Sequence, residues 1–168
     1  MSAIYYSRRA LCARSRQCGI IPPANPAVCA TRLSAVEIAD VGGTLDARLN
    51  SIDVAPRIEF TARCTTGVSL LFSGTIATEE VVAGPNPTFS VEIIVENRAN
   101  PTLSYTSQPV LVTCPSATGA PINLGLALDL ALPAASYAAW IRVTLFSYDT
   151  AIAFSLAGTF SMTRGSSS

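Results

Sequence analysis

Apolar and polar residues alternate with a period of two over most of the chain beyond residue 32. In 57–63, for example, isoleucine, phenylalanine and alanine occupy every second position, and arginine, glutamate and threonine lie between them. Because successive side chains of a strand point to opposite faces, this pattern predicts a strand with one buried and one solvated face. Runs 67–78 and 88–96 repeat the alternation, and glycine, proline or asparagine bounds them.

Runs of this kind predict eight or nine short strands. They lie near residues 33–39, 44–49, 57–63, 67–78, 88–96, 102–113, 120–131, 136–147 and 150–162. Short strands without helices between them predict an all-β protein, an antiparallel β-sandwich of the jelly-roll type. Pro109 falls inside one run, and since proline cannot donate a ladder hydrogen bond, it predicts an edge strand or a bulge there.

The first 32 residues follow no such pattern. Pro22, Pro23 and Pro26 favour an extended spacer. We therefore expect residues 1–32 to form an extended N-terminal arm and residues 33–168 to form a single β-sandwich domain, which fits a chain of 168 residues. The chain shows neither a secretory signal nor an apolar run of about 18 residues, so we expect no membrane insertion.

The amino-acid composition excludes several classes of catalytic site. The chain is 49% hydrophobic and 13% charged, and it contains neither histidine nor lysine. Serine and cysteine nucleophiles activated by histidine, and lysine-based catalysis, are thereby excluded. We expect no enzyme, no cofactor and no metal site. The mean hydropathy is positive, at +0.41, which predicts that part of the surface binds partners.

Charge separates the arm from the body. The arm carries five arginines and no acid, a charge of +5, whereas 33–168 carries six arginines and eleven acids, a charge of −5. This asymmetry favours docking of the arm on another copy of the body. The candidate docking residues are Arg8, Arg9, Arg14 and Arg16. An alternative is that they only keep the arm soluble, and so few arginines without lysine argue against nucleic acid.

The five cysteines are divided in the same way. Cys12, Cys18 and Cys29 lie in the arm, and Cys64 and Cys114 in the body. If all were oxidised, an odd number would leave at least one to bond outside its own chain, so all five are candidates for cross-links between subunits. Neither a Cys-x-x-Cys motif nor histidine is present to support zinc. The alternative is five reduced thiols, with the two body cysteines as small buried side chains.

One apolar patch is also predicted. Trp140 and Phe146 share the outer face of run 136–147, and exposed aromatic residues on a strand face are typical of interfaces. The alternative is that a loop or the arm covers them within one chain.

Several segments of the body, together with the arm, resemble a known family. These segments are Arg57–Thr61, Gly67–Ile76, Cys114-Pro115, Ser136–Leu145 and Ile152–Met162. They resemble β-sandwich domains of spore-forming Firmicutes, and the layout of arm and jelly roll is similar to bacterial endospore appendage (Ena-type) fibre subunits. The resemblance implies that Cys12 and Cys18 are connector cysteines that bond to Cys64 and Cys114 of other copies, with Cys29 near the hinge.

We therefore predict a structural subunit that polymerises with other copies of itself into a fibre. Its location would be extracellular or on a cell or spore surface after release. A viral or phage capsid or tail protein, located in the virion, is the first alternative. A carbohydrate-binding module is the second, in which Trp140, Tyr105 and Tyr148 could stack on sugars.

Overall fold

The computed structural model of the chain describes residues 32–46, 50–79, 85–115, 118–147 and 151–166. These residues form strands that pair antiparallel. In chain order they are β1 (Arg32–Leu45), β2 (Ser51–Ala62), β3 (Thr66–Thr78), β4 (Thr88–Asn97), β5 (Asn100–Thr106), β6 (Val110–Thr113), β7 (Ile122–Leu132), β8 (Ala135–Ser147) and β9 (Ile152–Ser166). The predicted all-β class is confirmed.

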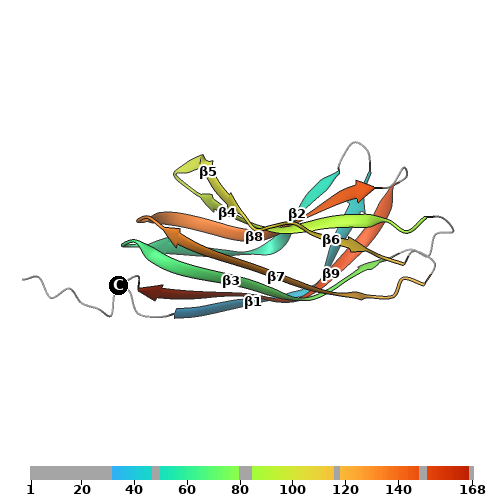
Figure 1. Ribbon diagram of the computed structural model, residues 1–168, viewed down its shortest axis with the longest axis horizontal. Helices are drawn as coiled ribbons and strands as arrows, with labels where there is room; N and C mark the ends of the chain where they lie inside the picture. Colours follow the sequence, from blue (N-terminus) through green and yellow to red (C-terminus); the bar gives the residue numbers. More distant parts are fainter. Residues whose placement is uncertain (1–31, 47–49, 80–84, 116–117, 148–150, 167–168) are drawn as a thin grey trace, which may run out of the picture.

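The strands form two sheets, which pack as two layers (Figure 1). Sheet A has the order β1-β9-β3-β7, and sheet B has the order β2-β8-β4-β5, with β6 also paired to β4. β5 pairs with residues 94–97 of β4 and β6 with residues 88–91, so together they form one broken edge strand. This crossing between two sheets is the double Greek key of a jelly roll, which confirms the predicted antiparallel β-sandwich.

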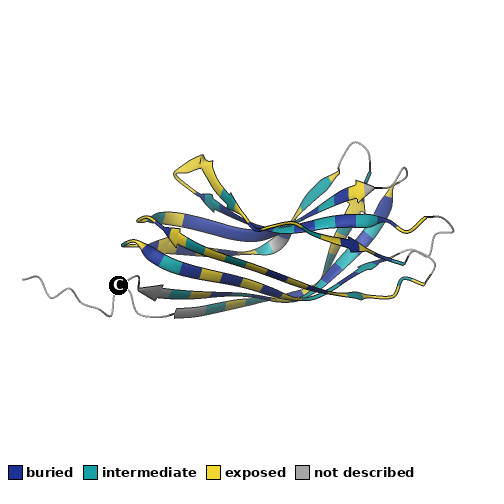
Figure 2. Cartoon of the chain, in the orientation of Figure 1, coloured by how far each residue is buried: buried dark blue, intermediate teal, exposed yellow. Residues whose placement is uncertain are grey.

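The core lies between the sheets because the period-two pattern turns one side of every strand inward. Phe72, Phe154 and Phe160 enter it from sheet A and Phe89 from sheet B, and all four are fully buried. The rings of Phe89 and Phe154 meet across the layers, with centroids 5.6 Å apart. Figure 2 shows buried and exposed residues alternating along β3 and β7. Burial of this apolar surface is the main stabilising contribution.

Two glycines allow β3 and β9 to approach closely. Gly74 pairs with Gly158, whose φ angle is +156°. A Cβ atom on Gly158 would lie 2.5 Å from the carbonyl oxygen of Ser73 and 2.6 Å from Cα of Gly74. Since a side chain cannot fit there, position 158 requires glycine.

Some strand boundaries differ from the prediction. The predicted strand 33–39 and the first residues of the predicted strand 44–49 belong to one strand, β1, whose register with β9 shifts between Ile38 and Val41. Asp40 in this bulge has a φ of +50°, which lets the strand absorb extra residues and continue. The predicted run 102–113 is instead divided into β5 and β6, with Pro109 between them at the edge of sheet B. The edge position expected for proline is confirmed.

Candidate functional site

Most of the predicted arm residues lie outside the described residues. These are Arg8, Arg9, Arg14 and Arg16 of the docking set, and Cys12, Cys18 and Cys29 of the cross-link set. The structure therefore places only Cys64 and Cys114 among the predicted cross-link residues, and Trp140 and Phe146 among the predicted patch residues.

Cys64 lies in the turn between β2 and β3. Thr66 fixes this turn by donating its hydroxyl to the carbonyl oxygen of Cys64 at 2.8 Å. The side chain of Cys64 is half-buried, and it is disulfide-bonded. Because Cys114 is free, this bond does not join the two body cysteines.

Cys114 is not available as a cross-link residue. It is fully buried in the core, where its sulfur lies 3.9 Å from the carbonyl oxygen of Ile76. Burial raises the pKa of this thiol to about 11, and the thiolate is the species that forms disulfides. The prediction that Cys114 bonds to another subunit is thus wrong for the folded chain, and the alternative of a small buried side chain holds.

Trp140 is covered by the body itself. It is 2% exposed, so its assignment to an exposed patch is wrong. The indole packs with Ile94 and Ala138 in a small apolar cluster on the outer side of sheet B, separate from the main core. The guanidinium carbon of Arg57 lies 4.3 Å from the ring centroid, and a cation over an aromatic face is attracted by it.

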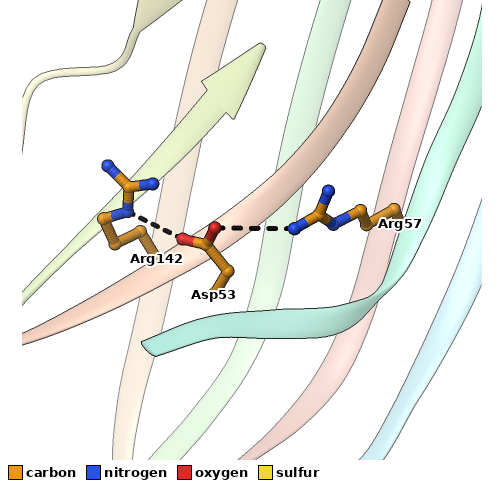
Figure 3. A network of polar contacts seen from close by, with 3 residues as sticks. All are labelled: Asp53, Arg57 and Arg142. Carbon is orange, nitrogen blue, oxygen red and sulfur yellow. Dashed lines mark hydrogen bonds and ion pairs between the residues drawn. The ribbon is translucent and has the colours of Figure 1, made fainter. Parts of the chain in front are cut away.

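Beside this cluster Asp53 joins two arginines from different strands (Figure 3). Nε of Arg142 on β8 donates to Oδ1 of Asp53 at 2.7 Å, and Nη2 of Arg57 lies 3.5 Å from Oδ2. Arg142 pairs in register with Asp53 on one side and with Glu92 of β4 on the other. Opposite charges therefore neighbour one another across three strands, an arrangement that stabilises a sheet.

These contacts change the pKa values of the pair. Burial raises the pKa of Asp53, but the hydrogen bond from Arg142, the indole of Trp140 and the charges of Arg142 and Arg57 outweigh it, so the pKa is lowered. The indole N–H is buried and lacks a partner at full hydrogen-bonding geometry. The hydrogen bond to Asp53 in turn raises the pKa of Arg142. Both groups are charged at neutral pH, as a structural ion pair requires.

The sequence pattern did not reveal this network, although two signals in the sequence point to it. Arg142 follows Trp140 by two residues, so alternation alone puts both side chains on one face. Pro56 lies between Asp53 and Arg57, at a register shift between Val54 and Ile58. The shift places Arg57 near Asp53. A strict alternation of faces along the strand does not predict that these two side chains are close together.

Phe146 is exposed, as expected, at 64% of its surface. Three other large apolar side chains are about half-exposed and were missed: Leu71, Leu103 and Leu111. Leu111 shares the outer face of sheet B with Phe146, because both neighbour the segment 88–90 of β4. Phe146 and Leu111 therefore lie on two strands that flank β4, and both are exposed near the same end of sheet B.

Comparison with known proteins gives a likeness of fold. No protein-family model matches the chain, and no curated protein matches it. The VP2 subviral particle of infectious bursal disease virus superposes with a TM-score of 0.54 and 11% identity, over 79% of this chain and 32% of that one. T=1 particles derived from the same virus give 0.55 and 11%, over 79% and 31%. This chain thus spans about a third of the length of those proteins.

The described residues show no other candidate centre. Among them no group of three or more cysteine, aspartate and glutamate side chains is placed to hold a metal ion. Over the same ranges no helix is long and apolar enough to cross a bilayer. Of the aromatic residues considered for sugar stacking, Trp140 is covered, Tyr105 is half-buried and Tyr148 lies outside the described residues.

Proposed function

We propose that the chain is a structural subunit that assembles with other copies of itself into an extracellular or spore-surface fibre. Residues 1–32 act as the connecting arm, and disulfides join the subunits. The role is mechanical rather than catalytic, in keeping with a chain that lacks histidine and lysine. The resemblance to endospore appendage subunits favours the fibre as the form of the assembly.

The position of Cys64 carries this proposal. Arg32, the first residue of β1, pairs with Arg164 of β9, which pairs in turn with Val68 of β3. The turn that holds Cys64 precedes β3, so it lies at the end of the sandwich where β1 begins. The arm therefore joins the body beside a cysteine that is disulfide-bonded and is not bonded to Cys114. That bond lies within a single chain, and in the fibre the same sulfur would instead pair with an arm cysteine of a neighbouring copy.

The bond requires an oxidising environment. Two thiols lose two protons and two electrons to an oxidant such as a small-molecule disulfide, which is reduced to two thiols as the cystine forms. Such conditions exist outside the cell and not in the cytosol. The fibre would thus become covalently joined only after its subunits are released.

A shell or tail component of a virus or phage is the second candidate. The jelly-roll likeness to VP2 of infectious bursal disease virus favours it. In that case the same body would form closed particles, and thiol reduction would leave them intact. The two candidates therefore differ in the shape of the assembly and in its response to reductant.

The first test compares native material on SDS gels with and without reductant, beside negative-stain images. A fibre subunit gives high-mass species that fall to about 17 kDa, the mass of one chain, only after reduction. A monomer in both lanes together with closed shells would favour the capsid candidate. A monomer in both lanes with no assembly in the images contradicts both.

Cysteine variants then locate the bonds. Cys12→Ser, Cys18→Ser and Cys64→Ser should each shorten the ladder, because each removes one proposed sulfur. Cys114→Ala is the matched control, since its thiol is free and fully buried, and its ladder should equal that of the unmodified chain. A ladder that depends on Cys114, or on none of the other three, refutes the proposed linkage.

A further inference from the structure

The two sheets have four edges, and three of them are interrupted. β1 and β2 each carry a register shift, at residues 38–41 and 54–58, the second around Pro56. The third edge is divided between β5 and β6, with Pro109 in the gap. Bulges, prolines and short edge strands are the devices by which proteins prevent other chains from pairing with a sheet. These three edges are therefore poor templates for strand addition.

β7, the remaining edge, has none of these devices. Its register with β3 runs without a shift from Thr66↔Leu132 to Ile76↔Ile122. The strand lies between Pro121 and Pro133, contains no proline and carries one charged residue, Asp129. In the part of the chain that the structure describes, no strand pairs with its outer side. A long, regular edge strand of this kind is a template for pairing with another chain.

We propose that β7 pairs antiparallel with β7 of a second copy, with a two-fold axis at Ala127. The proposal deepens the self-assembly proposed above. All 11 residues of β7 take part in this register, and sheet A of one copy becomes continuous with sheet A of the other. A two-fold contact must be self-complementary, because the same residues meet from both sides.

The outer side chains of β7 satisfy that requirement. In this register Gly125 lies opposite the partner's Asp129, so the two carboxylates of the dimer do not face each other. Asp129 already accepts a hydrogen bond from Ser69 at 2.5 Å. At the axis, Ala127 meets its own copy, and alanine is small enough for close pairing. No like charges are opposed on this face.

The inner side chains favour the same contact. Leu124 and Leu126 are buried, whereas Leu128 and Leu130 are only partly buried at the margin of the core. Pairing sets Leu126 opposite the partner's Leu128 and Leu124 opposite the partner's Leu130. The half-buried leucines would then be covered by leucines of the second copy, which removes more apolar surface from water.

The test measures association of the full chain in excess reductant, by light scattering after size exclusion over a range of concentrations. Reductant removes any contribution of cystine. Gly125→Arg and Gly125→Asp form a matched pair, because a Cβ at this position has no heavy atom within 4 Å. Arginine would face the partner's Asp129 and keep or tighten the dimer. Aspartate would face the same carboxylate and weaken it about threefold to twentyfold.

Two further variants test the axis and the edge. Ala127→Arg brings two guanidinium groups directly opposite each other and should weaken the dimer at least about tenfold. Ala35→Arg is the control, since Ala35 is exposed on β1 at the other edge of sheet A; it should leave association unchanged. Circular dichroism of each variant confirms folding.

The proposal is overturned if the reduced chain is monomeric throughout, if both Gly125 variants shift association in the same direction, or if Ala35→Arg disrupts it. The last result would assign the contact to β1. A covalent ladder without the reduced dimer refutes the β7 contact alone, and a reduced dimer without the ladder refutes the disulfide-linked fibre alone.

Discussion

The two sheets bury similar inner faces and differ on their outer faces. Sheet B places Trp140 on its outer face and covers its ring with Arg57, which is ion-paired with Asp53. The outer face of sheet A carries mainly alanine, serine, threonine and glycine. Leu71 lies on it with 51% of its surface exposed.

The difference concerns which parts of each sheet remain uncovered. On sheet B, the cluster around Trp140 and the ion network are formed within one chain, although Phe146, Leu103 and Leu111 on its strands remain exposed. On sheet A, the small side chains and the regular edge at β7 leave backbone and leucine surface uncovered. A second copy is therefore expected at the regular β7 edge of sheet A, whereas sheet B keeps Phe146, Leu103 and Leu111 as exposed apolar side chains.

The largest expected effect is at the outer cluster of sheet B. Trp140→Ala removes a buried indole from Ile94 and Ala138 and deprives Arg57 of the ring beneath it. We expect a loss of about 3 to 5 kcal/mol in the free energy of unfolding, measured in urea. Leu71→Ala on sheet A should cost less than about 1 kcal/mol, because that side chain is half in water. Equal losses would remove the distinction between the faces.

A second prediction concerns what holds sheet A together. Gly158→Ala places a methyl group 2.5 Å from the carbonyl oxygen of Ser73, at a positive φ. We expect a loss of about 2 to 4 kcal/mol in the free energy of unfolding. Gly125→Ala is the control, since its Cβ has no heavy atom within 4 Å. If both substitutions have the same effect, close backbone approach is not what stabilises β3 against β9.

The fold could be predicted from the sequence because alternation is a local property. It placed the large apolar inner residues of β3 and β4 on the correct side, and the turn residues separated the strands. Cys114 follows Val112 by two residues and both are buried, whereas the prediction from the cysteine count made Cys114 a cross-link candidate. Alternation within each strand therefore contributed more to the fold prediction than composition did.

The covering of Trp140 could not be predicted in this way. Parity correctly assigns it to the outer face of β8, but its exposure depends on Arg57. The register shift in β2 brings the Arg57 side chain over the ring. A bulge changes which face the following residues occupy, so simple alternation in the sequence does not predict this contact. The sequence likewise made Cys64 and Cys114 equal candidates among the body cysteines, and only the fold distinguishes the buried Cys114 from Cys64.

The third prediction tests the ion network of sheet B by pH. The pKa of Asp53 is lowered in the folded chain, so its contribution is present above the ordinary unfolded value of about 3.9 and is lost as the pH falls below it. Asp53→Asn should cost about 1 to 2 kcal/mol at pH 7, and its unfolding free energy should fall less between pH 5 and pH 2. If the unfolding free energy of the variant falls between pH 5 and pH 2 as much as that of the unmodified chain, the charge of Asp53 does not stabilise the fold.

The smallest effect is expected at the exposed ion pair of the same face. Nη1 of Arg98 lies 2.7 Å from Oε2 of Glu59, yet the two side chains are 53% and 59% exposed. Water screens such a pair, so Glu59→Gln should change the free energy of unfolding by less than about 0.5 kcal/mol in urea at pH 7. An effect equal to that of Asp53→Asn would show that pairing alone stabilises this face. A small effect of Glu59→Gln would show that the partly buried ion pairs beside Trp140 contribute more to stability than the exposed pair does.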